Sequence, residues 1–290
     1  MSASNSCKKS QSQILGYFKD DFQHEGTENP GVKKRVEMSK NGRKFRVRGR
    51  IFNPLFLQDK PILPSDIILK YYRNSDVKTT LGDCRLQITD FKLHLVLGKL
   101  NATSVVDISK QLMSNFEPYN SSEIEMNSYH LTDTVQTTLK NISSGSLPNF
   151  IVVCFQKDLR FRGSSNKLNH RYVDPGISRI WLSNLDQQFP LNAPYNFENN
   201  SYTELYKNIF NQTKISSVDF ELSDLKTGFY IIPFDLSENF NRQVIAKTDS
   251  SDLQLHLHFK SEVTNLNVII YIIRDVTLNL NHLNQVHLSY

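Results

Sequence analysis

The stretch Leu253-Gln254-Leu255-His256-Leu257-His258-Phe259-Lys260 decides the fold class of this chain. Apolar and polar residues alternate along it, and a period of two residues is typical of a β-strand with one buried face. The next apolar stretch contains an unbroken run over residues 268–273, which predicts a strand that is buried on both faces. Together with residues 227–237, which precede them, these segments predict a layered β-protein.

Apolar segments of the same kind recur upstream. We expect further strands over residues 44–51, 67–72, 85–97, 123–142, 150–155 and 177–182. The phase of the alternation changes near Thr89 and Asp90, which predicts either a β-bulge or two strands joined by a tight corner. Short helices are expected over residues 105–116, with Ser104 as the N-cap, and over residues 202–210.

Many strands with few helices between them argue against a parallel α/β fold. The sequence therefore predicts an all-β protein, an antiparallel jelly roll or β-sandwich with a few short helices in its loops. Its 290 residues suffice for one large β-domain or two adjacent jelly rolls. We expect a mobile polar arm over residues 1–38, a first β-rich jelly-roll-like region over residues 39–145 and a second over residues 146–290. Within the arm, residues 13–18 form an apolar patch that either docks on a neighbouring surface or has no role.

Composition and charge place few constraints on function. The formal net charge of +5 is mildly basic and is by itself weak support for nucleic-acid binding. The three cysteines, Cys7, Cys84 and Cys154, are widely spaced, which favours reduced thiols in an intracellular setting over disulfides or zinc ligation. No secretory signal and no apolar run of membrane-spanning length is found, so we expect neither secretion nor membrane association.

Four cations stand on one face of the predicted strand over residues 44–51: Lys44, Arg46, Arg48 and Arg50. One interpretation is contact with packaged nucleic acid or with an acidic surface. The other is an edge strand whose charges protect it against aggregation. No aromatic stacking platform accompanies these charges, which favours the second interpretation.

Motifs of catalysis are absent from the sequence. It contains no P-loop, no GxGxxG and no GxSxG, and its acidic residues are dispersed. His256 and His258 lie two residues apart and face the same side, so they could hold a metal only with a third ligand. We expect this pair to face solvent or an interface, and Trp181 to fill a gap between the layers. The sequence thus predicts no enzyme, with no catalytic residue, no metal and no cofactor.

Several segments resemble the jelly-roll capsid-like proteins of Polinton/Maverick elements and adinto-like viruses, in the family's order and over roughly residues 36–280. The segments that carry the resemblance are residues 47–52, 55–58, 61–64, 72–75, 84–97, 147–153, 228–237, 253–259 and 267–271. This chain departs from the family pattern at residues 214–217, where the family has Gly-Asn, and at Cys154, where it has glycine. It is therefore identified as a shortened or divergent member.

The resemblance implies a structural capsid protein of viral or transposon origin that is located in the virion. Its implied partners are copies of itself, as a trimer or pentamer within a shell, other capsid proteins and packaged DNA. It leaves open a major shell subunit or a smaller vertex protein. An alternative of another class is a non-catalytic β-sandwich module that recognises a protein or glycan through residues 158–176 and 186–200.

Overall fold

The structure is a computed structural model. It describes residues 24, 28–39, 44, 46–49, 51, 53–58, 62–63, 66–72, 87–96, 98–99, 101–114, 117–163, 171–184, 187–190, 193–199, 201–213, 221–236, 252–281 and 285–289. Cys7, Cys84, Arg50 and the apolar patch over residues 13–18 lie outside the described residues.

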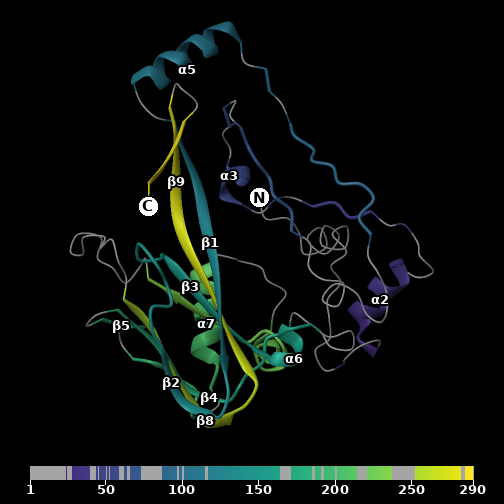
Figure 1. Ribbon diagram of the computed structural model, residues 1–290, viewed down its shortest axis with the longest axis vertical. Helices are drawn as coiled ribbons and strands as arrows, with labels where there is room; N and C mark the ends of the chain where they lie inside the picture. Colours follow the sequence, from purple (N-terminus) through teal and green to yellow (C-terminus); the bar gives the residue numbers. More distant parts are fainter. Residues whose placement is uncertain are drawn as a thin grey trace.

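Two antiparallel sheets form the body of the protein (Figure 1). Sheet A has the order β1-β9-β3-β7, with β10 also paired to β9; these strands are Glu117–Leu131, Leu266–Leu280, Phe150–Lys157, Ile231–Asp235 and Val286–Ser289. Sheet B has the order β2-β8-β4-β5, with β6 also paired to β4; these strands are Thr134–Leu139, Leu253–Val263, Ile177–Asn184, Gln187–Phe189 and Tyr195–Asn196.

The strand order identifies a jelly roll. The chain crosses between the sheets at nearly every step from β1 to β9, and the last strand of the roll, β9, pairs with the first, β1. In the other sheet the second strand of the roll, β2, pairs in the same way with the second-to-last strand, β8. Two antiparallel sheets whose main strand orders, β1-β9-β3-β7 and β2-β8-β4-β5, are wound in this way form the jelly-roll arrangement. The predicted all-β antiparallel fold is therefore confirmed.

The core lies between the two sheets, where alternate residues of each strand meet. From β8 it receives Leu253, Leu255, Leu257 and Phe259, which are all buried as their alternation predicts. In β9 both faces are buried, because Ile270 joins the inter-sheet core while Ile269 is buried on the opposite face. Burial of this apolar surface is the main stabilising contribution to the roll.

The roll spans the boundary that was predicted near residue 145. Strands β1 and β2 lie before that boundary, yet they pair with β9 and β8, which lie after it. In the described residues the jelly roll therefore runs from β1 to β9. The division into a first jelly-roll-like region over residues 39–145 and a second over residues 146–290 stays a prediction.

Strands β1 and β9 are much longer than the roll requires. They pair along their whole lengths, from Glu117 opposite Leu280 to Leu131 opposite Leu266. In Figure 1 they run out of the roll as a ribbon, which β10 extends, and helix α5 (Ala102–Ser114) is drawn beyond its far end. A short helix, α3 (Pro54–Leu57), packs against β1 in this ribbon.

The remaining helices cover the roll or precede it. They are α2 (Pro30–Ser39), α6 (Asp158–Phe161), α7 (Thr203–Thr213) and α8 (Leu222–Thr227). Helices α7 and α8 each bury one leucine in the core, Leu205 and Leu225. The two predicted helices are thus present as α5 and α7. The predicted cap of α5 is wrong, because the Asn101 side chain accepts from the Ser104 backbone N–H at 2.7 Å.

Helix α2 lies within the predicted polar arm. The Asn29 carboxamide oxygen accepts from the N–H groups of Gly31 and Val32 at 3.0 and 3.3 Å, which caps the helix. Pro30 is its first residue, where a missing N–H costs nothing. Asn29 and Val32 are buried. The mobile arm over residues 1–38 stays a prediction.

Three predicted upstream strands are not formed in the described residues. In the ranges 44–51, 67–72 and 85–97, the residues that the structure describes belong to no strand or helix, so no bulge is seen near Thr89 and Asp90. Alternation specifies a strand only when a neighbour pairs with it and a layer covers its apolar face. Here the described apolar side chains are exposed, Val47 and Ile51 among them.

Candidate functional site

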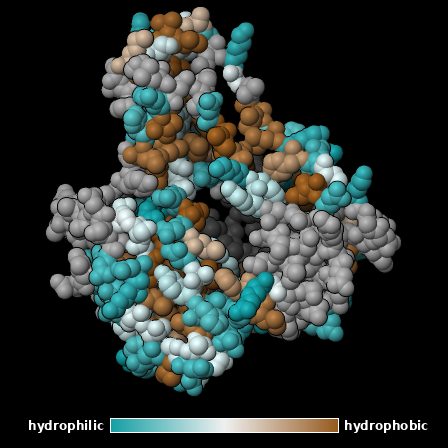
Figure 2. Space-filling model, viewed as in Figure 1, coloured by the Kyte–Doolittle hydropathy of each residue, from teal (hydrophilic) through white to brown (hydrophobic). Residues whose placement is uncertain are grey.

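Exposed apolar side chains gather on the chain that precedes the roll. Two segments, residues 66–72 and 87–96, lie side by side, since the rings of Tyr71 and Phe91 are 5.2 Å apart. Their exposed large apolar residues are Ile67, Ile68, Leu69, Tyr71, Tyr72, Ile88, Phe91, Leu93, Leu95 and Val96. We call these two segments the apolar arm. In Figure 2 hydrophobic side chains are prominent in the upper part of the molecule, above the roll.

Chain upstream of the apolar arm is fixed to the β1 ribbon. The Tyr119 ring on β1 is buried, and its hydroxyl accepts from the Leu63 backbone N–H at 3.0 Å. Ser121, two residues further along β1, donates to the Asn53 carboxamide oxygen at 3.3 Å, and the same oxygen accepts from Leu55 N–H and caps α3. These contacts connect the segment that leads to the apolar arm with the roll.

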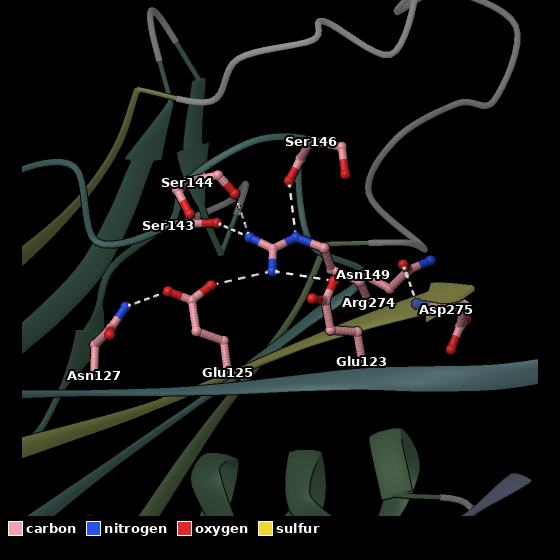
Figure 3. A network of polar contacts seen from close by, with 9 residues as sticks. All are labelled: Glu123, Glu125, Asn127, Ser143, Ser144, Ser146, Asn149, Arg274 and Asp275. Atoms are coloured by element: carbon pink, nitrogen blue, oxygen red, sulfur yellow. Dashed lines mark hydrogen bonds and ion pairs between the residues drawn. The ribbon is translucent and has the colours of Figure 1, made fainter. Parts of the chain in front are cut away.

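A buried arginine organises one end of the roll (Figure 3). The Arg274 side chain on β9 is only 6% exposed. Its guanidinium donates to Glu125 Oε2 at 3.2 Å, to Ser143 Oγ at 2.6 Å and to the backbone carbonyls of Ser144 and Ser146 at 2.6 and 3.2 Å. A planar group with five donors can satisfy several acceptors at once. Arg274 therefore holds the β2–β3 connection against β1 and β9.

Asn149 completes this connection. Its side-chain oxygen accepts from the Asp275 N–H at 3.0 Å, and its backbone N–H donates to the Ile273 carbonyl at 3.1 Å. Its own carbonyl accepts from the Leu236 N–H at 2.9 Å, just after β7. Arg274 interrupts the apolar pattern of β9, which is the weak sequence signal for this network. Sequence analysis did not predict its burial.

The outer face of sheet B carries an aromatic cluster of Trp181, His256 and His258. Trp181 on β4 lies opposite His256 on β8, and their rings stack at 4.7 Å with an interplanar angle of 8°. The His258 ring meets the indole edge-on at 5.0 Å. The prediction that Trp181 fills a gap between the layers is wrong, because the core positions of β4 belong to its neighbours Ile180 and Leu182.

Both nitrogens of His256 have hydroxyl partners on the two neighbouring strands. Nδ1 lies 3.0 Å from Thr138 Oγ1 on β2, and Nε2 lies 2.8 Å from Ser183 Oγ on β4. Burial, with a smaller contribution from His258, lowers the pKa of His256. The prediction that the pair lies on the polar side of its strand agrees with this placement.

The predicted basic residues are exposed where they are described. Lys44, Arg46 and Arg48 lie on the surface, outside any strand, and Arg50 lies outside the described residues. The role of these residues in binding nucleic acid stays a prediction.

Reactive chemistry has little support in the described residues. Among them, no group of three or more His, Cys, Asp and Glu could hold a metal ion. Burial raises the pKa of the Cys154 thiol, which disfavours the nucleophilic thiolate, and raises that of Tyr195 to about 12. No helix in the described part of the chain has the length and apolarity to cross a membrane.

Comparison with known proteins finds matches among solved structures alone. No family model and no curated protein matches the chain. The cryo-EM structure of the Sputnik virophage is similar at 14% identity and a TM-score of 0.36, over 60% of this chain and 38% of that one. PBCV-1 VP54 is similar at 9% identity and a TM-score of 0.39, over 66% of this chain and 55% of that one.

The mavirus major capsid protein is similar at 12% identity and a TM-score of 0.34, over 60% of this chain and 41% of that one. This chain thus matches between about two fifths and just over half of the length of these three proteins. Similarity at this level identifies no family, and it is the strand order described above that assigns the fold.

Proposed function

We propose that this chain is a capsid structural protein of viral or transposon origin, which assembles with copies of itself through the apolar arm. The jelly-roll strand order is compatible with this function, since shell proteins use the fold, although lectins and cupins use it too. The resemblance to capsid-like proteins of Polinton/Maverick elements and adinto-like viruses favours the shell. Under this proposal the chain resides in the virion and has no catalytic role.

The observation that carries the proposal is the exposure of the apolar arm. Side chains such as Tyr72 and Val96 are 82% and 103% exposed, and eight further large apolar residues of the two segments are also exposed. Their combined exposed area is on the order of 1,000 Å², while one partner of a standard protein interface buries about 800 Å². Monomeric proteins rarely expose large apolar patches, so we infer that a neighbouring subunit covers these side chains.

Charge on the apolar arm is expected to abolish self-association. Leu95→Glu places a carboxylate where a neighbouring subunit would exclude water, which costs several kcal/mol per contact, or about a hundredfold or more in affinity. Leu159→Glu is the matched control, because Leu159 on α6 is 60% exposed and Leu95 is 64% exposed. Sedimentation velocity of the full chain should show oligomers for the wild type and for Leu159→Glu, and monomers for Leu95→Glu.

Two outcomes of that experiment would count against the proposal. Equal sedimentation of Leu95→Glu and wild type would show that the apolar arm is not the contact. A wild-type chain that stays monomeric would favour the alternative, a β-sandwich module that binds a protein or glycan through residues 158–176 and 186–200.

We also propose that the basic stretch Lys44, Arg46, Arg48 and Arg50 contacts packaged DNA. Reversing three of these charges, in Arg46→Glu/Arg48→Glu/Arg50→Glu, is expected to weaken DNA binding at low salt by at least about tenfold and to flatten its salt dependence. The control is a triple reversal of exposed lysines on the roll, Lys140→Glu/Lys157→Glu/Lys207→Glu, which changes the net charge equally. Fluorescence anisotropy with labelled duplex DNA measures the affinity and its salt dependence. An equal loss of DNA affinity in the two triple variants would contradict a specific role of this stretch.

A further inference from the structure

His256 and His258 lie on β8, at positions where a positive charge would affect the pairing of β8 with its neighbouring strands. Strand β8 is central in the sheet, and β2 is an edge strand that pairs with β8 alone among the described strands. His256 lies directly opposite Thr138 of β2 on one side and Trp181 of β4 on the other. Its two ring nitrogens reach hydroxyls on both of these strands, so this one side chain links β2, β8 and β4 across the outer face.

The charged groups around His256 are mostly cationic. His258 lies on the same face of β8, and Arg179 of β4 lies opposite it. The carboxylate of Glu198 is already paired with Arg179, at 2.9 Å. Lys140, which is exposed, follows the end of β2, two residues after Thr138. A proton on either histidine therefore adds positive charge to a region that already holds two cations.

The remaining charges of β8 lie further along the strand. Asp252 precedes the strand, where it accepts from the Gln254 amide at 3.4 Å, and Lys260 and Glu262 lie beyond His258. None of the described carboxylates is recorded as a hydrogen-bond or ion-pair partner of His256 or His258. The charged form of the pair thus lacks the acidic neighbour that would stabilise it.

We propose that the Trp181–His256–His258 cluster is an acid-sensitive switch, in which protonation of His256 weakens the attachment of β2 to β8. Two imidazolium rings two residues apart on one strand repel each other, and the stacked indole hinders hydration of the charged His256 ring. Attraction between an imidazolium and the indole face opposes these effects. Burial of the ring, with a smaller contribution from His258, lowers the pKa of His256, so the neutral ring is favoured despite that attraction.

The direction of the pH dependence follows from this lowered pKa. Because the folded-state pKa of His256 lies below its unfolded value of about 6.5, the stabilisation from the neutral ring is complete above that value. It is lost as the pH falls towards and through the folded-state pKa. The roll should therefore be less stable in mild acid, with sheet B affected first at its β2 edge.

Trp181 is the only tryptophan in the chain, so its fluorescence reports on this cluster alone. A protonated imidazole in contact with indole quenches its emission. We expect the emission of wild type to fall with a midpoint below about pH 6.5, and His256→Gln to remove this transition. His94→Gln, which changes an exposed histidine of the apolar arm, should behave as wild type.

Thermal unfolding tests whether protonation of the cluster also changes the stability of the roll, beyond its effect on Trp181 emission. Between about pH 7.5 and pH 5.5 the melting temperature of wild type should fall, and in both His256→Gln and His258→Gln the fall should be smaller by on the order of 2 °C. A melting temperature of wild type that rises in acid, or an equal fall in all variants, would overturn the proposal. Emission that does not change between these pH values would overturn it as well.

Discussion

Arg274→Met is expected to lower the free energy of unfolding by about 3 kcal/mol. Methionine fills much of the same space but donates no hydrogen bond. Ser143 Oγ and the carbonyls of Ser144 and Ser146 then lose their donor, and Glu125 loses its cation at 3.2 Å. Because Glu125 is one third exposed, water recovers part of this loss, which keeps the effect below that of a fully buried pair.

Urea unfolding measures this effect, with Arg162→Met as the matched control. Arg162 also pairs with a carboxylate, Asp158 at 2.8 Å, but its side chain is 76% exposed, so its loss should cost less than about 1 kcal/mol. Arg274→Lys should fall between wild type and Arg274→Met, since an ammonium keeps the charge but not the planar set of donors. A loss for Arg274→Met no larger than for Arg162→Met would show that the network does not stabilise the roll.

Ile270→Ala is expected to cost about 3 kcal/mol of folding free energy. Ile270 lies in the central strand β9, opposite Asn127 of β1 and Val153 of β3, and it is fully buried between the sheets. Removing three carbons there leaves a cavity that paired strands on both sides cannot close.

The same substitution on the surface provides the control for Ile270→Ala. Ile124 of β1 is 61% exposed, so Ile124→Ala should change the unfolding free energy by no more than about 0.5 kcal/mol. Chemical denaturation of both variants gives the comparison. Similar costs at the two sites would contradict the placement of Ile270 in the inter-sheet core.

Local pattern predicted the strands β3, β4, β7, β8 and β9, because each of them has an apolar face that the fold buries. Strand β8 follows its alternation along residues 253–259, and β9 follows its unbroken apolar run. The same pattern failed over residues 85–97, where the described residues have no pairing strand. An alternating pattern shows that a segment is able to form a strand. Whether the strand forms depends on a pairing strand, which the local sequence does not specify.

Long-range pairing could not be predicted from the sequence. Strands β1 and β9 are separated by most of the roll, yet they pair over their full length, and no local signal in Glu117–Leu131 specifies that partner. The stacking of Trp181 on His256 depends on the register between β4 and β8, which is equally non-local. The sequence analysis noted both histidines, but it did not predict that the hydroxyls of Thr138 and Ser183 contact His256.

The roll and the apolar arm have different consequences for function. The strands of the roll pair with one another, and the core between its sheets is formed by residues of a single chain. The apolar arm leaves residues such as Phe91 and Leu95 exposed, and under the proposed function a second copy of the chain covers them. In a closed symmetric assembly each such contact recurs in every subunit, so a modest interface suffices for a stable shell.

Electron microscopy of the purified full chain tests this account most directly. Assembly through the apolar arm predicts symmetric multimers or shell-like particles in the wild type, and dispersed single chains in Leu95→Glu. Uniform monomers of the wild-type chain at its highest soluble concentration would contradict the account.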